Sequence, residues 1–336
     1  MTILAAELKF YHALEVSTAG TNGGRMSANE IISGVVNNVW PHVLQAERTA
    51  GSTTWRKIFA KNSNDNDETF LSADLFNDKP TAAGDYIVLF AGTQTDTQTD
   101  VSGGSPRLYG GAALKSDVSS GGSTVVVDVE DAAQTGMFQN GDKIRLSDMA
   151  DPLAGTGNEE LLTISGAPTV SGTEVTITVA ETIANAYTVA GGGHVSSLYH
   201  VGDVKCAFDN WAETCAGSGT YDEAANPPIM DNIGTAYQTW TLTFTDATHY
   251  TVSGDTVGSV GSGDTSTDFA PVNSDFSKPW FKLEAAGFAG TWAGSDTIVF
   301  KTHPAAAPIW LKRVVPAGTS SLANNRNITA FMGESA

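Results

Sequence analysis

Hydrophobic and polar residues alternate along several short segments in the middle of the chain. In the segment 123–130, three valines share one face while polar residues occupy the other. The same period of two recurs in three further segments: 142–148, 160–165 and 174–180. This period is typical of β-strands that bury one face. The pattern predicts a small β-barrel module at residues 118–192, inserted between Gly/Ser-rich borders; the alternative is that these strands continue one large sandwich.

Short apolar segments separated by turn residues also lie on both sides of this module. They are found at 52–64, 68–78, 85–96, 237–246, 249–254, 278–285, 296–301, 307–315 and 326–333. Eight or more short strands at regular spacing are typical of β-sandwiches. Neither flank has enough strands for a core of its own. The N-terminal part, 1–117, and the C-terminal part, 193–336, are therefore predicted to form one sandwich body from which the module projects.

One short helix is predicted near the N-terminus, at residues 27–40. Ser27 and Glu30 stand at the spacing of a capping box, and apolar residues follow at helical spacing. Pro41 would end this helix. The fold class is thus mainly β, with one helix.

Charge limits the partners that the chain can bind. It has 336 residues, 18 Lys and Arg against 37 Asp and Glu, and a formal net charge of −19. Such a chain repels phosphate backbones and anionic membranes, so neither nucleic acid nor a membrane is an expected partner. Only 16% of the residues are charged, against roughly 25% in an average soluble domain. A surface of Ser, Thr, Asn and Gly is typical of virion or extracellular β-proteins.

No signal peptide and no membrane span are expected from the hydropathy pattern. The chain is therefore predicted to be made in a cytosol and to be soluble there. Its two cysteines, Cys206 and Cys215, are compatible with one disulfide or with two free thiols.

The sequence contains little that points to catalysis or metal binding. His200 with Cys206 and Cys215 would supply three zinc ligands, but the spacing is not that of a zinc site and a fourth ligand is missing. The acidic loop 64–69 lacks the glycine and the final glutamate of an EF-hand, which favours a solvated turn. Asp209 and Glu213 are the pair that a hydrolase would use as acid and base. We predict no enzyme activity, no cofactor and no metal.

Aromatic residues and one polar loop are the remaining candidates for binding a sugar or a neighbouring subunit. Trp240 alternates in phase with apolar neighbours, which predicts a core position, whereas Trp280 and Trp292 lie near turns and could be exposed in a sugar-binding surface. Core or subunit-contact roles are favoured for both. The segment 92–104 is polar and of low complexity, which predicts an exposed loop or one that orders against a neighbour.

Three segments resemble proteins of tailed bacteriophages. Residues 22–64, beginning NGGRMSANEII, resemble the N-terminal region of phage structural proteins, and IWLKRVVPAGT at 309–319 looks like the closing strand of a phage sandwich domain. The segment 124–148 is similar to small β-barrel modules of phage tail and fibre proteins. The resemblance implies a virion component, of the contractile tail or its baseplate.

These features predict a non-enzymatic virion assembly protein, which contacts other virion proteins and copies of itself as a homo-oligomer within the particle. One alternative is a carbohydrate-binding adhesin or fibre-associated receptor-binding protein. Another is a head decoration, neck or tail-tube protein. The segment 307–315 has two readings. Lys312 and Arg313, next to Trp310, either face water on an edge strand or contact an acidic surface.

Overall fold

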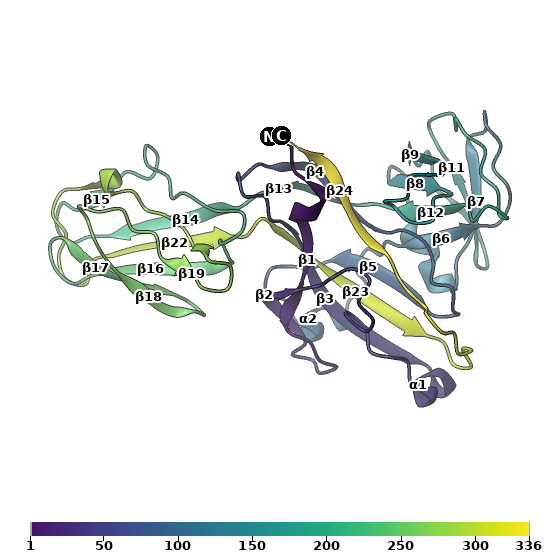
Figure 1. Cartoon of the computed structure of the whole chain (residues 1–336), viewed down its shortest axis with the longest axis horizontal. Coiled ribbons are helices and arrows are strands. Elements are labelled where there is room, and N and C mark those ends of the chain that lie inside the picture. Colours follow the sequence, from purple (N-terminus) through teal and green to yellow (C-terminus); the bar gives the residue numbers. More distant parts are fainter. Residues whose placement is uncertain (1, 336) are drawn as a thin grey trace.

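The computed structural model describes residues 2–335 and is built almost entirely from antiparallel β-sheets (Figure 1). The predicted mainly β fold class is confirmed. Its helices are short: α1 (Gln45–Ala50), α2 (Gln98–Ser102), and the 3-10 helices η1 (Ala5–Glu7), η2 (Ala132–Met137) and η3 (Ala285–Gly287). Within residues 2–335, no helix is long and apolar enough to cross a bilayer.

A central body is formed by two sheets that pack face to face. The first has the order β2-β1-β3-β23-β5, and its strands are β1 (Leu8–Glu15), β2 (Gly23–Glu30), β3 (Ser52–Asn62), β5 (Tyr86–Ala91) and β23 (Ala306–Val315). The second has the order β13-β4-β24, with β4 (Phe70–Asn77), β13 (Tyr199–Val204) and β24 (Thr329–Ser335). Side chains such as Ile309, Leu311 and Leu75 form the apolar layer between them. Strand β23 lies between two strands from the start of the chain, so both ends of the sequence build this body.

The middle lobe, residues 111–197, is a seven-stranded sheet in the order β10-β11-β7-β6-β12-β8-β9. Its strands are β6 (Gly111–Leu114), β7 (Thr124–Asp128), β8 (Lys143–Ser147), β9 (Glu159–Thr163), β10 (Thr169–Ser171), β11 (Glu174–Thr178) and β12 (His194–Ser197). The sheet closes over one apolar core that includes Val125, Val127 and Val129. Burying each such side chain contributes about 1.5–3 kcal/mol, and the alternation fixes which face turns inward.

The C-terminal lobe, residues 207–303, has its own sheet in the order β14-β22-β16-β17-β18. Its strands are β14 (Ala207–Thr214), β16 (Gln238–Phe244), β17 (His249–Gly254), β18 (Gly258–Asp264) and β22 (Thr297–His303). Two small pairs cover this sheet: β15 (Thr220–Tyr221) with β21 (Phe288–Ala289), and β19 (Val272–Asn273) with β20 (Lys278–Pro279). The core is rich in aromatic rings, with Trp240 fully buried at its centre. The predicted core position of Trp240 is confirmed.

The chain leaves the body twice (Figure 1). After β5 it builds the middle lobe and returns as β13, and after β13 it builds the C-terminal lobe and returns as β23. The seven-stranded sheet extends beyond the 118–192 module on both sides, and residues 207–303 form a core separate from that of the body. The sheets therefore divide the two flanking parts of the chain further than the sequence pattern predicts.

The helix predicted at residues 27–40 is wrong. Ser27 and Glu30 belong to β2, where the Ser27 hydroxyl donates to the His12 carbonyl at 2.9 Å and Glu30 pairs with Lys9 at 2.9 Å. These cross-strand bonds use the side chains that would have capped a helix. Gly34 then adopts φ +81°, which a helix does not contain. The segment 31–44 crosses the body sheet as irregular chain.

Polar contacts join the three parts, the first of them fully buried and the second at the exposed Asp67. Asp78, fully buried after β4, accepts from Arg145 Nη1 at 2.6 Å and contacts His194 Nε2 at 3.2 Å, which ties the body to the middle lobe. Asp67 of the body accepts from the Asn232 amide at 2.6 Å, which ties it to the C-terminal lobe. Because such groups are costly to leave unpaired away from water, these contacts hold each lobe in a defined position.

Candidate functional site

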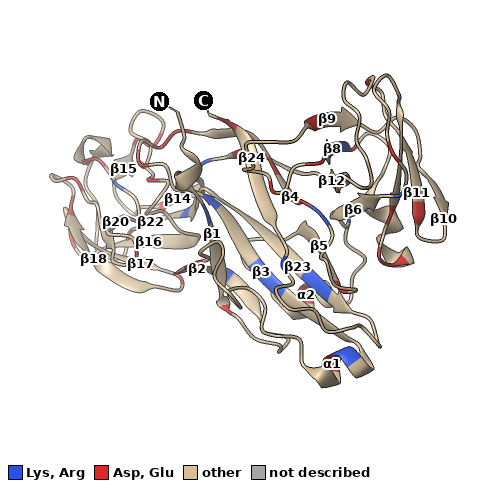
Figure 2. Cartoon of the chain, turned by 45° about the vertical axis from the view of Figure 1, so that its right-hand side comes forward, with Lys and Arg blue, Asp and Glu red and all other residues tan. Residues whose placement is uncertain are grey.

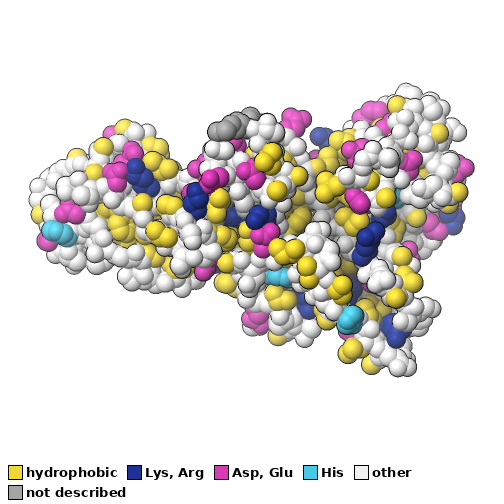
Figure 3. All heavy atoms as spheres, in the orientation of Figure 1, with side chains coloured by type: hydrophobic (Ala, Val, Ile, Leu, Met, Phe, Trp, Pro, Cys, Tyr) yellow, Lys and Arg dark blue, Asp and Glu magenta, His cyan; other side chains and the backbone are white. Residues whose placement is uncertain are grey.

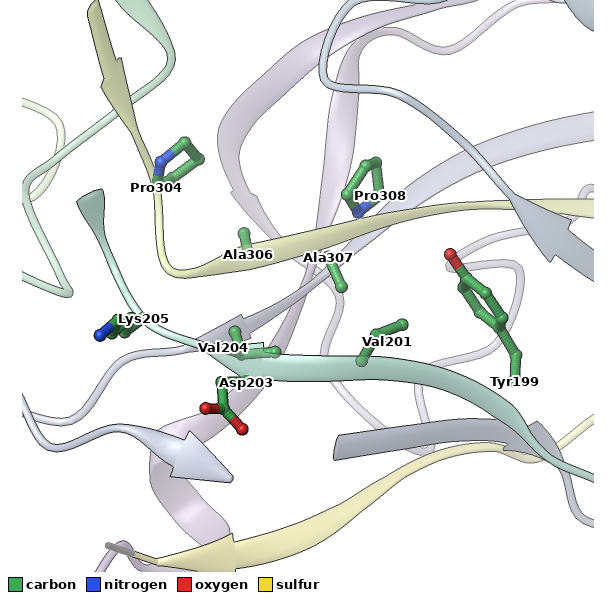
Figure 4. Close-up of a pocket in the computed structure, with 9 residues that line it drawn as sticks. All are labelled: Tyr199, Val201, Asp203, Val204, Lys205, Pro304, Ala306, Ala307 and Pro308. Carbon is green, nitrogen blue, oxygen red and sulfur yellow. The ribbon is translucent and has the colours of Figure 1, made fainter. Parts of the chain in front are cut away.

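A shallow groove of about 210 Å³ lies between β13 and the start of β23 (Figure 4). Small apolar side chains form most of its wall, and three polar groups lie at its ends. The lining residues are Tyr199, Val201, Asp203, Val204, Lys205, Pro304, Ala306, Ala307 and Pro308.

The groove exists because two strands lack a partner at this point. Strand β13 is the edge of its sheet and pairs only with β4. Strand β23 pairs with β5 only from Ile309 onward, so the residues before it pair with β3 alone. Pro308 has no N–H to offer a further strand. The result is a gap between two backbone segments, floored by alanine and valine.

The polar ends of the groove differ in character. Tyr199 packs against Tyr109 with ring centres 5.2 Å apart, and burial raises the pKa of the Tyr199 hydroxyl, which therefore stays a neutral donor. At the other end Asp203 and Lys205 are exposed, and Asp203 accepts from the Ser72 amide at 3.1 Å. No nucleophile with an adjacent base lines this groove. Its chemistry suits contact with a short extended apolar segment.

The residues considered for zinc are not brought together. His200 of β13 contacts Asp74 of β4 at 2.8 Å. The Cys215 thiol lies in the C-terminal lobe, where it contacts Asp296 at 3.1 Å. Both cysteines are free, and burial raises the pKa of Cys206 to about 12, which keeps it a thiol. Across residues 2–335 there is no cluster of His, Cys, Asp and Glu that could hold a metal ion.

The acidic loop 64–69 is a junction. The buried Asn64 side chain accepts from the amides of Asn66 and Glu68 at 2.9 and 3.2 Å, which shapes the turn. Asp65 forms an ion pair with Lys278 of the C-terminal lobe. The predicted solvated turn is present, since residues 65–67 are exposed, and its carboxylates also bind protein groups of the C-terminal lobe.

Asp209 and Glu213 do not form an acid–base pair. Asp209 contacts His303 Nε2 at 3.0 Å across the β14–β22 pair. Glu213 accepts from the Trp211 indole and from the Tyr221 amide, each at 3.0 Å. The two carboxylates thus have separate structural partners.

The favoured core roles of Trp280 and Trp292 are confirmed, and the alternative of exposed tryptophans is wrong. Trp292 is 3% exposed and stacks on Phe244, with ring centres 4.1 Å apart and an interplanar angle of 3°. Trp280 lies edge-on to the buried Trp240 at 5.6 Å and packs against the same core. These rings hold the C-terminal lobe together, so they give no support to a sugar-binding surface.

The segment 92–104 is largely exposed, as predicted, but it orders against its own chain. It contains helix α2, and Asp96 accepts from the Trp310 indole at 3.0 Å and pairs with the fully buried Lys57 at 2.6 Å. Gly23, with φ +113°, leaves the space that the Trp310 ring occupies, since a Cβ there would lie 2.8 Å from the ring.

Both readings of the segment 307–315 are wrong. Strand β23 is a central strand, and Trp310 is fully buried. Arg313 is 4% exposed and lies over the Trp40 ring at 4.9 Å. Lys312, half-buried, lies over the Trp55 ring at 5.1 Å. Neither Trp310 nor Arg313 is available as a surface anchor.

Sequence reasoning missed a set of buried cations. Lys57, Lys61 and Arg145 are at most 1% exposed. Lys61 is the extreme case, since its ammonium has no hydrogen-bond partner among residues 2–335 and burial lowers its pKa to about 8. The sequence contained one indication of these buried cations. Lys57, Phe59 and Lys61 occupy alternate positions, so on a strand the two lysines share a face with the apolar Phe59.

Comparisons with known proteins give no family. No protein-family model and no curated protein matches the chain. Among solved structures, the phage phi92 endosialidase is 12% identical, with 79% of this chain and 41% of that chain covered and a TM-score of 0.18. The infectious bursal disease virus VP2 subviral particle is 11% identical, with 88% and 81% covered and a TM-score of 0.10. The chain spans less than half of the endosialidase, and neither similarity supports an argument about function.

Proposed function

We propose that this chain is a non-enzymatic structural component of a tailed-phage virion, in the tail or baseplate, and that it acts through contacts between subunits. The proposal rests on one observation: charged and thiol side chains of the chain contact other groups of the same chain. Asp67, Asp78 and Arg145 hold the three parts of the chain to each other. Asp209, Glu213 and the Cys215 thiol contact protein groups close by instead of forming a catalytic or metal site.

The architecture suits such a role. The C-terminal lobe has its own core, and the core of the middle lobe continues into the body through Tyr86 and Val88 of β5. Paired chain crossings join the three parts, which gives a long, shaped surface for neighbours. Several sheets end in edge strands, among them β13, β18 and β24, that are open to contact. The resemblance of residues 22–64, 124–148 and 309–319 to phage proteins supports a tailed-phage virion as the particle to which the chain belongs. An adhesin role loses its support, because the tryptophans that motivated it are core residues.

The test is the composition of particles purified from the producing host. We expect the chain in every particle at a fixed stoichiometry, with antibody label at the tail or its base, and we expect particles made without it to be incomplete. A chain that is absent from purified particles contradicts the proposal. Label at the head or along the tail tube would instead place it among the head decoration, neck or tail-tube proteins.

A further inference from the structure

The lower end of the body differs in charge from the rest of the molecule. Its two segments, 31–56 and 311–327, are called the basic end here. They contain five basic residues and one acidic residue, whereas the rest of the chain has 13 basic and 36 acidic residues. Figure 2 shows this contrast, with blue segments on β3, β23 and α1 and red segments over both lobes.

The cations of the basic end have no carboxylate partner. Elsewhere in the chain Lys and Arg commonly pair with Asp or Glu, as Lys9 does with Glu30 and Arg25 with Asp255. Within residues 2–335, no such ion pair is formed by the five cations of this end: Arg48, Arg56, Lys312, Arg313 and Arg326. Two of them, Arg56 and Arg313, lie over the Trp40 ring, and the buried Arg313 Nε and Nη2 lack acceptors. Their positive charge is therefore not neutralised by direct contact.

An exposed apolar patch covers the same end. Ile32, Val35, Val36 and Leu44 are 52%, 55%, 76% and 64% exposed, and no charged residue lies between Glu30 and Glu47. In the view of Figure 3, hydrophobic and basic side chains lie together at the lower end of the body. An apolar centre beside unpaired cations matches a partner with an apolar residue flanked by carboxylates.

The middle lobe carries such a surface. It has 11 acidic residues against three basic ones, and its loop 148–158 exposes Leu153 at 86%. Asp148 and Asp151 both precede this leucine, and their carboxylates accept from the backbone amides of Asn158 and Leu153; Glu159 at the end of the loop already pairs with Arg145. Two copies with a charge of −19 each repel one another, so a contact between them needs the one end where the charge is reversed.

We propose that the basic end of one copy binds the 148–159 loop of the middle lobe of a second copy, in a head-to-tail contact. Val36 and its neighbours cover Leu153, and the half-buried Arg48 and the exposed Arg326 face Asp148 and Asp151. Because the two surfaces differ, each copy offers one of each, and the contact repeats into a ring or a filament. The proposal deepens the proposed function by giving a surface through which copies meet, and its test in solution is independent of particle composition.

The experiment uses the purified full chain in sedimentation velocity over a range of concentrations. Val36→Asp and Leu153→Asp should each weaken association about tenfold or more, since each puts a charge at the centre of the contact. Val272→Asp, at a valine 65% exposed in the C-terminal lobe, is the matched control and should associate as the wild type does. Association should also weaken as salt rises from about 0.05 to about 0.5 M.

Mixing the two variants tests the head-to-tail arrangement. The Val36→Asp chain keeps an intact 148–159 loop, and the Leu153→Asp chain keeps an intact basic end. An equimolar mixture should therefore form a 1:1 dimer, although each variant alone stays monomeric. The proposal is overturned if the wild type is monomeric, if either variant associates as the wild type does, if the mixture stays monomeric, or if association strengthens with salt.

Discussion

The ammonium of Lys61 lies 5.2 Å from the centre of the Phe276 ring and has no hydrogen-bond partner within residues 2–335. Lys61 comes from β3 of the body, and Phe276 comes from the C-terminal lobe. The contact therefore places a fully buried charge where the two parts meet. A cation–π contact of about 0.5–2 kcal/mol offsets only part of the cost of removing an ammonium from water.

The first prediction is that Lys61→Met stabilises the protein. The pKa of Lys61 falls from 10.5 to about 8 through burial. A depression of this size corresponds to about 3 kcal/mol of lost stability at neutral pH, which methionine should recover while filling the same space. Denaturant unfolding of both chains at neutral pH measures the difference. Equal or lower stability of the variant would show that the ammonium has a partner after all.

The same group predicts a pH dependence with a defined sign. The pKa of Lys61 is lower in the folded chain than in the unfolded chain. Between pH 8 and 10.5 the unfolded chain therefore binds more protons than the folded chain does. The penalty is complete below about pH 8 and disappears as the pH rises to about 10.5. The stability gap between Lys61→Met and the wild type should therefore shrink over this window. A gap that is constant with pH contradicts the assignment.

A second prediction concerns the junction of the body and the middle lobe. Arg145→Ala removes the guanidinium that pairs with the buried Asp78. The Oδ2 atom of Asp78 already lacks a hydrogen-bond partner among the described residues. Breaking a buried pair in this way costs about 3–5 kcal/mol. We expect a matching loss of unfolding free energy and faster proteolysis between the two parts. The control is Lys115→Ala, which breaks the exposed pair with Asp128 and should leave stability nearly unchanged.

Local patterns in the sequence predicted what depends on local chemistry. The alternation at 123–130 identified a strand and its buried face, and Val125, Val127 and Val129 are all core residues. The period of two is sufficient there, because a register shift of one residue would turn every valine to solvent. The mainly β class followed from the repetition of such segments.

The sequence did not reveal features that depend on distant partners. Ser27 and Glu30 have the spacing of a helix cap, but their bonds go to β1, a strand that no local rule relates to them. Trp310 and Arg313 looked exposed because β23 resembles an edge strand until its pairing with β3 and β5 is known. The groove beside β13 likewise depends on strand order, which the sequence pattern leaves open.

A third prediction separates two neighbouring cations of β23. Arg313 is buried, lies over Trp40 and donates to the Pro41 carbonyl at 3.1 Å, so Arg313→Glu should lower the free energy of unfolding by about 3–5 kcal/mol. Lys312 is half-buried and contacts the Trp55 ring, so Lys312→Glu should cost about 1 kcal/mol. Thermal unfolding of the single variants measures both. Similar losses for the two would contradict the burial difference between them.

The last prediction concerns how much of the middle lobe is needed for folding. Strands β6 and β12 join β7 to β8 on one side of this lobe, in the order β7-β6-β12-β8, while the bridge between Ile164 and Val179 joins the ends of β9 and β11 on the other side. A fragment limited to residues 118–192 lacks both linking strands and exposes core side chains on each side of the gap. A fragment of residues 109–198 contains all seven strands and most of the core, including Val195 and Ala112; only Tyr86 and Val88 of β5 are missing from its buried residues.

We therefore expect the 109–198 fragment to unfold cooperatively with a β-type circular dichroism spectrum, and the 118–192 fragment to lack a cooperative transition. Each strand in this sheet gains its stability from backbone bonds on both sides and from a shared apolar face, so removing two central strands leaves pairs that are marginal in water. Arg145 loses Asp78 in either fragment and is therefore no source of a difference between them. A cooperative 118–192 fragment would show that β7 and β8 can pair without the strands that separate them here.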